Sequence, residues 1–214
     1  MAEDGLSAWK ILFGRALRII DAVAAPGARL EDWSLGGGTV LMLRFRHRVS
    51  KDVDIFVPDP QWLGYVIPRL NETAEELTQK YLETAISVKL YFPEGEADFI
   101  ASGPLTGHPV SVERVLGREV RLDSTAETIA KKVQHRAREF TARDLFDLAL
   151  VASRDPASIE AIRPILRRRR ALIRQRIAAG ERALRTAFAA LDTLDYRPGF
   201  DECVRAVLET LEAA

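Results

Sequence analysis

Two aspartates stand in an otherwise apolar run shortly after three consecutive glycines, in the segment LGGGTVLMLRFRHRVSKDVDIFVP at residues 35–58. Side chains two residues apart on a β-strand point to the same side, so Asp52 and Asp54 share one face of a strand. Val53 and Ile55 then point to the opposite face, toward the core. Because ionised carboxylates are costly to bury without a positive partner, the acidic face must bind a cation or meet water.

The three glycines, Gly36, Gly37 and Gly38, precede a run of helical pattern from Thr39 to about Arg46. Backbone amides at the N-terminus of a helix attract phosphate, and glycines leave those amides accessible. Two neighbouring carboxylates repel each other, and Mg²⁺ removes that repulsion while it also binds substrate phosphates. The segment therefore predicts a nucleoside triphosphate bound next to a metal ion.

A third carboxylate would complete a two-metal site, in which the ions lie about 3.5–4 Å apart. Asp98 is the candidate, because it lies in the apolar strand ADFIA, which can pair beside the strand that carries the other two aspartates. Asp52 and Asp54 are the predicted ligands of Mg²⁺, with Mn²⁺ as an alternative ion.

Several other functional classes are excluded by the sequence. The glycine run lacks the spaced lysine of a P-loop and the later glycine of a dinucleotide fingerprint, and no HExxH motif is present. The formal net charge is zero, so attraction to nucleic acid or membranes depends on local clusters. The single cysteine, Cys203, fits a reducing compartment, and no apolar run approaches the ~20 residues of a membrane span. Since the N-terminus also lacks a signal-peptide pattern, we expect a cytoplasmic protein that does not enter the membrane.

The hydrophobic pattern changes character near residue 123. Before it, the periodicity predicts helices at 6–24, 39–46 and 61–82, and strands at 33–35, 53–57, 85–92, 96–101 and 118–123. Pro93-Glu94-Gly95 predicts a hairpin between two of these strands. The expected fold class is α/β (α+β), with a mixed sheet flanked by helices over residues 1–123 and a helical domain over residues 124–214.

From Ser124 onward the pattern is helical. Ser124–Glu127 and Thr141–Asp144 have the residue types of capping boxes and predict helices at 125–139 and 142–153. Further helix starts and breaks are indicated by proline and glycine at Asp155-Pro156, Pro164, Gly180 and Pro198-Gly199.

Two segments together resemble the AbiEii-type nucleotidyltransferase toxins, within the polymerase-beta-like nucleotidyltransferase superfamily. The first is GGTVLMLRFRHRVSKDVDIF, which is similar to a glycine turn, a helix and Ser-x-Asp-x-Asp, here Gly37-Gly38, Ser50, Asp52 and Asp54. The second is AETIAKKVQHRAREFTARDLFDL, which is similar to the later motifs of the family at Lys132, Arg138, Arg143, Asp144 and Asp147. The resemblance covers about residues 30–152.

The resemblance implies a metal-dependent nucleotidyltransferase, of the EC 2.7.7 type, that transfers a nucleoside monophosphate from an NTP to an acceptor. It implies catalytic roles for Asp52, Asp54, Lys132 and Asp144. It implies substrate-binding roles for Gly37, Gly38, Ser50, Asp98, Arg138 and Asp147. The helical domain then completes the active site. The family also implies a toxin neutralised by a separately encoded antitoxin, and RNA, at the 3′ end of tRNA, as the acceptor.

Simpler structural explanations remain for several of these residues. Asp52 and Asp54 can end a solvent-facing strand and pair with nearby basic side chains. Asp144 can serve only as part of a capping box, and Asp147 can pair with Arg143 one helical turn before it. Lys131 competes with Lys132 for the role of the family lysine, and we assign that role to Lys132 because an apolar residue follows it.

Two other functions stay open at this point. One is a nucleotidyltransferase that acts on a small molecule or a protein, and the other is a non-catalytic module that binds nucleotide or RNA. The basic run Arg167–Arg170 can be a solvated helix face, or a patch whose phosphate contacts would weaken with salt. Lys89, which lies in a predicted strand, can be an ordinary exposed residue.

Overall fold

The computed structural model describes residues 2–23, 30 and 32–214, and of residues 2–6 only the backbone. The chain divides into two compact units, which we call the sheet unit and the helical unit. The sheet unit contains Met1–Thr39, Ser50–Pro104 and Val110–Leu122, and the helical unit contains Val40–Val49, Leu105–Pro109 and Asp123–Ala214. The division falls inside helix α2 (Gly37–Phe45), so that the glycine turn belongs to the sheet unit.

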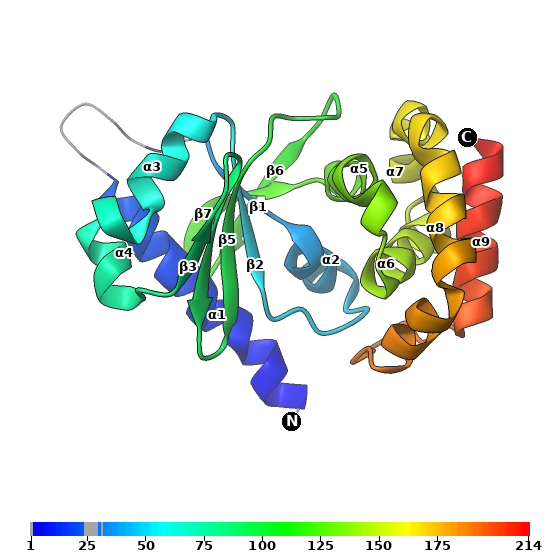
Figure 1. Cartoon of the computed structure of the whole chain (residues 1–214), viewed down its shortest axis with the longest axis horizontal. Helices are drawn as coiled ribbons and strands as arrows, with labels where there is room; N and C mark the ends of the chain where they lie inside the picture. The colour runs from blue at the N-terminus through cyan, green and yellow to red at the C-terminus, as the bar shows by residue number, and fades with distance from the viewer. Residues whose placement is uncertain (1, 24–29, 31) are drawn as a thin grey trace. The chain divides into compact units, whose positions relative to one another are not determined.

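Among its described residues, the sheet unit has seven strands in the order β3-β4-β5-β2-β1-β7-β6 (Figure 1). Their bounds are β1 Ser34–Gly36, β2 Val53–Val57, β3 Tyr81–Glu83, β4 Ser87–Phe92, β5 Gly95–Ala101, β6 Val110–Val115 and β7 Arg118–Asp123. β2 runs parallel to β5 and antiparallel to β1, whereas β1 runs parallel to β7. The sheet is therefore mixed, which confirms the predicted fold class.

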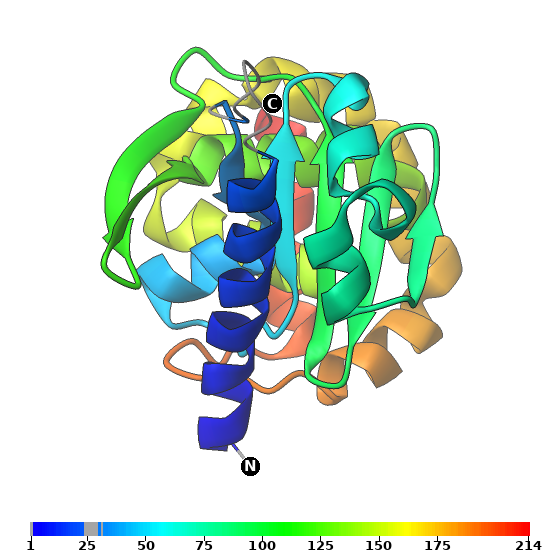
Figure 2. The ribbon, with the colours of Figure 1, turned by 90° about the vertical axis from the view of Figure 1, so that its left-hand side faces the viewer.

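Helices α1 (Ala2–Ala22), α3 (Leu63–Val66) and α4 (Glu72–Leu77) cover one face of this sheet (Figure 2). Alternate side chains of the central strands are fully buried, among them Val53 and Ile55 of β2 and Phe99 of β5. This alternation separates an apolar face under the helices from a second face that carries polar side chains. The sequence prediction for residues 53–57 is confirmed.

Gly14 lies in the middle of α1, and a methyl group added at its Cα would have no atom within 4 Å. Glycine loses more backbone entropy than alanine when a helix forms, and it has no side chain to offset the loss. We expect Gly14→Ala to raise the free energy of unfolding by about 0.5–1 kcal/mol. Denaturant titration measures this change, and a lower midpoint would contradict it.

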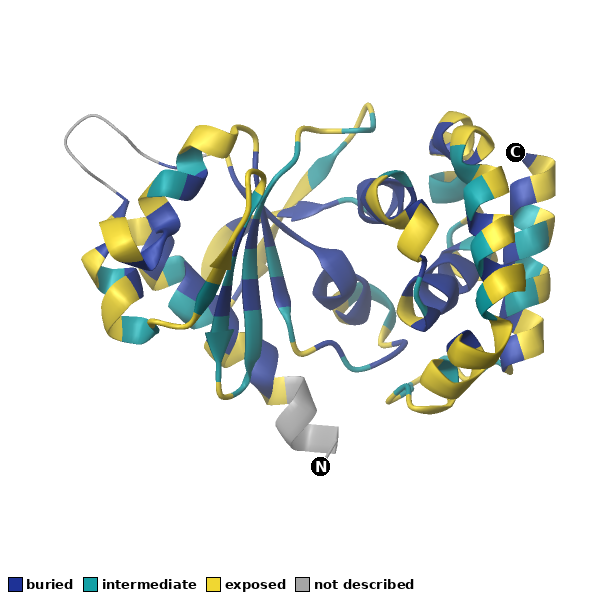
Figure 3. Ribbon diagram, viewed as in Figure 1, coloured by how far each residue is buried: buried dark blue, intermediate teal, exposed yellow. Residues whose placement is uncertain are grey.

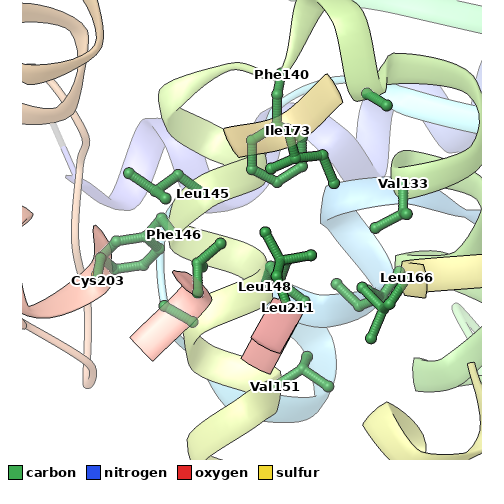
Figure 4. Close-up of a cluster of buried hydrophobic side chains, with 14 of the residues drawn as sticks. Val133, Phe140, Leu145, Phe146, Leu148, Val151, Leu166, Ile173, Cys203 and Leu211 are labelled. Atoms are coloured by element: carbon green, nitrogen blue, oxygen red, sulfur yellow. The ribbon is translucent and has the colours of Figure 1, made fainter. Parts of the chain in front are cut away.

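The helical unit contains α5 (Thr125–Arg136), α6 (Ala142–Arg154), α7 (Pro156–Ala161), α8 (Arg163–Ala189) and α9 (Phe200–Ala213). Apolar side chains from α5, α6, α8 and α9 form its core, including Val133, Phe146, Leu166, Ile173 and Leu211 (Figure 4). Helix α6 is buried along most of its length (Figure 3). No described helix is both long and apolar enough to cross a lipid bilayer.

The segment after α2 is tied to a distant segment of the same helical unit. Arg48 forms an isolated antiparallel bridge with Thr193. The Leu194 amide donates to the His47 carbonyl at 2.8 Å, and the Val49 amide donates to the Asp192 carbonyl at 2.8 Å. These backbone bonds fix the path of residues 47–49 within the helical unit.

The helix predicted over residues 61–82 is wrong in extent. The segment contains the 3-10 turns Pro60–Trp62 and Pro68–Leu70 around α3, then α4, and it ends in strand β3. Pro68 has no amide to continue a helix. Asn71 starts α4 afresh, because its side chain accepts a hydrogen bond from the Ala74 amide at 2.9 Å.

Other predicted elements agree with the structure, with three corrections. The hairpin at residues 93–95 is confirmed by the pairing of β4 with β5, but strand β6 was not predicted. Gly180 does not break a helix, since it lies inside α8. Ser124 caps α5 without a capping box: the Glu127 carboxylate accepts instead from the Leu105 and Thr106 amides. The helix predicted at 6–24 is α1, which ends at Ala22, whereas residue 24 and Pro26-Gly27 lie outside the described residues.

Candidate active site

Charged side chains form a row across the polar face of the sheet, opposite the face that the helices cover. The register pairs Asp54 of β2 with Asp98 of β5, and it pairs Asp98 with Lys89 of β4. Directly paired residues on neighbouring strands point to the same face, so the two carboxylates and the ammonium are neighbours there. The predicted position of Asp98 beside the Asp-x-Asp strand is confirmed. Asp52, one residue before β2, accepts a hydrogen bond from the Glu96 amide at 3.2 Å.

The glycine turn lies directly against one of these carboxylates. Gly37 opens α2 with a φ of +69°, in the left-handed region that favours glycine. A Cβ atom added there would lie 2.7 Å from Asp54 Cγ and would overlap its Oδ2. Asp54 also pairs with Gly36 in the β1–β2 ladder. The backbone of the turn and the Asp54 carboxylate therefore occupy one small region, with Gly38 next in the helix.

Thr39 connects the turn to the aspartate strand. Its hydroxyl donates to the Asp52 carbonyl at 2.5 Å, and its Oγ1 lies 3.2 Å from the Ser50 Oγ. Ser50 is buried beside it. The sequence indicates Thr39 only as the start of a helical run, whereas in the structure its side chain joins the turn to the aspartate strand.

Asp98 has an electrostatic environment unlike that of an exposed carboxylate. Burial raises its pKa to about 6; Lys89 opposes this change, and the charge of Asp54 reinforces it. Within the described chain, its Oδ1 is buried without a hydrogen-bond partner. A buried carboxylate oxygen of this kind needs a proton or a cation. The oxygen ligands of this row thus suit a hard divalent cation.

The carboxylates alone do not enclose a metal ion. Among the residues that the structure describes, no group of three or more His, Cys, Asp or Glu side chains converges to hold one. Mg²⁺ commonly keeps several waters and binds through one or two carboxylates plus substrate phosphates. The side chains present fit that mode of binding, with Asp52 and Asp54 as the protein ligands, rather than a closed protein cage.

Lys89 is held by acidic neighbours on the adjacent strand. Its Nζ lies 2.6 Å from Glu96 Oε2 and 3.4 Å from Asp98 Oδ2. Burial by itself lowers the pKa of Lys89, but the hydrogen bond to Glu96 and the charge of Asp98 outweigh burial and raise it. Lys89 therefore remains an ammonium at neutral pH.

A second set of predicted residues comes together inside the helical unit. Asp147 is fully buried, and its oxygens lie 2.7 Å from Arg48 Nε, 2.7 Å from Arg48 Nη2, 2.9 Å from His47 Nε2 and 3.2 Å from Lys132 Nζ. Burial alone would raise the pKa of Asp147, but Arg48 and Lys132 hold it well below its ordinary range. His47 has a lowered pKa, mainly because it is buried, and stacks on Phe146.

Asp144 both caps α6 and contacts Lys132 within the same cluster. Its Oδ2 accepts from the Thr141 amide and hydroxyl, which completes the predicted capping box. Its Oδ1 accepts from Lys132 at 2.9 Å. Burial opposes ionisation of Asp144, but Lys132 and Arg136 lower its pKa.

The structure also gives the positions of Lys131, Arg138 and Arg143. Lys131 bonds Asp123 at 2.8 Å, so Lys132 is the lysine that meets Asp144 and Asp147. Arg138 is exposed in a 3-10 turn, and Arg143 is exposed in the first turn of α6. The arginine that binds Asp147 is Arg48, which the sequence reasoning missed because its partner lies 99 residues away.

Several arginines of α8 contact other parts of the helical unit. Arg167 donates to the Ala214 carbonyl, Arg169 to the Gln134 side chain, and Arg174 pairs with Glu212. These contacts support a solvated, partly paired helix face, and they leave several exposed guanidinium groups along it.

The overall fold is that of the nucleotidyltransferase toxins. The structure resembles MenT4, a nucleotidyltransferase toxin from Mycobacterium tuberculosis H37Rv, with a TM-score of 0.53 and 17% sequence identity over 98% of this chain and 83% of that chain. It also resembles JHP933 from Helicobacter pylori, with a TM-score of 0.53 and 14% identity over 100% of this chain and 92% of that one. No functionally curated protein shows significant sequence similarity to the chain.

The family follows from the sequence itself. Residues 18–214 match the family described as "Nucleotidyl transferase AbiEii toxin, Type IV TA system", and the chain belongs to this family. The protein is thus a nucleotidyltransferase toxin of a type IV toxin–antitoxin system, a class that implies a nucleotide substrate and an antitoxin partner.

Proposed function

We propose that the protein transfers a nucleoside monophosphate from an NTP to a hydroxyl group of an acceptor, and that the reaction depends on Mg²⁺ or Mn²⁺. The observation that carries the proposal is the contact between the glycine turn and the acidic row: Gly37 lies against Asp54, and Asp54 pairs with Asp98. Helix-terminal amides bind phosphate, and carboxylate oxygens bind divalent cations. The sheet unit can therefore hold both parts of a metal–triphosphate complex.

The predicted site residues of the sheet unit have separate roles in this scheme. Asp52 and Asp54 would hold the metal ion, which when bound neutralises charge on the phosphates and on the leaving pyrophosphate. The amides of Gly37 and Gly38, with the Ser50 hydroxyl, would bind phosphate oxygens. The acceptor oxygen forms a bond to the α-phosphorus, the bond between that phosphorus and the bridging oxygen breaks, and pyrophosphate leaves.

Asp98 is the better candidate for the group that orients the acceptor hydroxyl and takes its proton. Its Oδ1 has no partner among the described residues, and its raised pKa, about 6, is closer to neutral pH than that of an ordinary carboxyl. Both oxygens of Asp144 already accept hydrogen bonds, from Thr141 and Lys132. Asp144 and Asp147 would instead keep Lys132 charged and in place within the helical unit.

We further propose that the acceptor is RNA, at the 3′ end of tRNA, and that the protein acts in the cytoplasm. The exposed arginines of α8 and of the turn at Arg138 support a polyanionic acceptor. A small molecule or protein acceptor is the alternative, which the zero net charge favours.

Incubation of the purified protein with total RNA, Mg²⁺ and each labelled NTP in turn tests the proposal. We expect one NTP to label RNA, and we expect EDTA to abolish the labelling. Asp52→Ala should lower transfer by at least about a hundredfold, the size of effect that follows loss of one electrostatic stabiliser.

Asp32→Ala is the matched control, because it also removes one carboxylate from the sheet unit but from an exposed ion pair with Arg121. It should leave transfer unchanged. A folded Asp52→Ala protein that transfers nucleotide at the wild-type rate would remove Asp52 from the site. Labelling of a protein or small molecule instead of RNA would support the alternative acceptor.

A further inference from the structure

The β4–β5 hairpin places two further charged side chains beside the row of Asp54 and Asp98. Neither side chain has a role in the reaction proposed above. They are Lys89 of β4 and Glu96 of β5. The ammonium of Lys89 contacts both Glu96 Oε2, at 2.6 Å, and Asp98 Oδ2, at 3.4 Å. The backbone amide of Glu96 donates to Asp52 Oδ1. Glu96 thus contacts Asp52 directly, through its backbone amide, and contacts Asp98 indirectly, through Lys89.

The two oxygens of Asp98 are unequal in this arrangement. Oδ2 faces the Lys89 ammonium, whereas Oδ1 is buried and lacks a partner among the described residues. A carboxylate can rotate about its terminal torsion, which is broad and roughly two-fold. A cation fixed on one side of the group selects one orientation. The short bond to Glu96 fixes the ammonium, so the unpaired oxygen of Asp98 has a defined direction.

We propose that Lys89, held by Glu96, is the positioning residue for Asp98 in the transfer reaction. This inference rests on the proposed function and adds to it. By occupying Oδ2, Lys89 leaves Oδ1 to meet the reacting group. Its positive charge also offsets the mutual repulsion of Asp54 and Asp98 before substrate binds. Lys89 acts through Asp98 and does not itself bind the NTP.

The test compares Lys89→Met, Lys89→Arg and Glu96→Gln with the wild type in the labelled-NTP assay, with kcat and KM for the NTP measured separately. We expect Lys89→Met to lower kcat about tenfold to a hundredfold, the cost of a misplaced reacting group. The KM should stay within about twofold, because substrate binding is not the affected step. Lys89→Arg should restore most of the loss, and Glu96→Gln should have an intermediate effect.

Binding of Mn²⁺ in the absence of NTP supplies a second measurement. Removing the Lys89 charge next to carboxylates strengthens their attraction for a cation, so Lys89→Met should bind Mn²⁺ more tightly although it transfers more slowly. A merely structural lysine would not produce these opposite changes. Lys80→Met is the control, because Lys80 is exposed in the same unit. It should alter neither quantity.

Three results would overturn the inference: an unchanged kcat in Lys89→Met, a raised KM alone, or weaker Mn²⁺ binding. A raised KM alone would make Lys89 a phosphate ligand. Thermal unfolding of each variant identifies any loss of activity that comes from misfolding. If Lys89→Met does not fold, Lys89→Arg, which retains the positive charge, supplies the comparison with the wild type. A wild-type protein that transfers from no NTP would show that the proposed function itself has failed, and the inference would fail with it.

Discussion

Asp147→Asn is expected to destabilise the helical unit by about 3–5 kcal/mol, the usual cost of breaking a buried charge pair by removing one partner. The wild-type cluster balances the two cations Arg48 and Lys132 against the two carboxylates Asp144 and Asp147. The asparagine leaves one positive charge uncompensated in a site that water does not reach. Denaturant unfolding measures the change.

A double substitution distinguishes this electrostatic cause from lost packing. Asp147→Asn combined with Arg48→Met removes one charge of each sign, and it should recover a large part of the stability that Asp147→Asn loses. Asp195→Asn is the surface control, since Asp195 pairs with Arg46 where both side chains are well exposed. It should change stability little. If the double variant is as unstable as Asp147→Asn, the charge balance is not the reason that Asp147 is buried.

The same cluster gives stability a defined dependence on pH. Asp147 has a pKa well below its ordinary value of 3.8 when folded, so its contribution is present above that value and is lost as the pH falls through the folded pKa. His47 also has a lowered folded pKa, so acidification below 6.5 favours the unfolded state, in which it can take up a proton. As the pH is lowered, the free energy of unfolding of the wild type should therefore fall in two stages, first when His47 is protonated and then when Asp147 is protonated. Asp147→Asn should show little of the second fall.

The sequence predicts the candidate site well where its signal is local. In β2 every residue except Asp54 is buried, and Gly36, which precedes the glycine turn, pairs with Asp54 in the β1–β2 ladder. The adjacent position of Asp98 follows from an apolar strand interrupted by one acid, because such a strand must lie centrally and still expose that acid. These features depend on side-chain alternation and turn chemistry, which a short segment determines by itself.

The partners of buried charges could not be predicted in the same way. Arg48 and Asp147 are separated by 99 residues, and no spacing rule relates two side chains that meet only through tertiary packing. Arg143 is the expected partner of Asp147 on helical spacing alone, but the Asp147 side chain is fully buried and Arg143 is exposed. The contacts of Lys89 could not be predicted for a related reason, because they depend on the register of β4 on β5.

Gly37→Ala is expected to lower nucleotide transfer by about a hundredfold or more, the effect of a small displacement at the reacting centre. Alanine at a φ of +69° is strained by roughly 1–2 kcal/mol, because its Cβ approaches the following carbonyl. The larger consequence is functional. The new Cβ would lie 2.7 Å from Asp54 Cγ and 3.0 Å from Asp54 Cβ, so the carboxylate must move from its position beside the turn.

The measurement pairs the transfer assay with denaturant unfolding of the same protein. Activity should fall much further than stability, because a flexible carboxylate can move aside at low cost to the fold but not to the site. Gly64→Ala is the control, since a Cβ at Gly64 in α3 would have no atom within 4 Å, and it should retain full transfer. A folded Gly37→Ala protein with wild-type transfer would mean that Asp54 can leave the turn without consequence. The metal and the phosphates would then have to be held elsewhere, because the proposed reaction requires the turn amides and the Asp54 carboxylate to act on one substrate together.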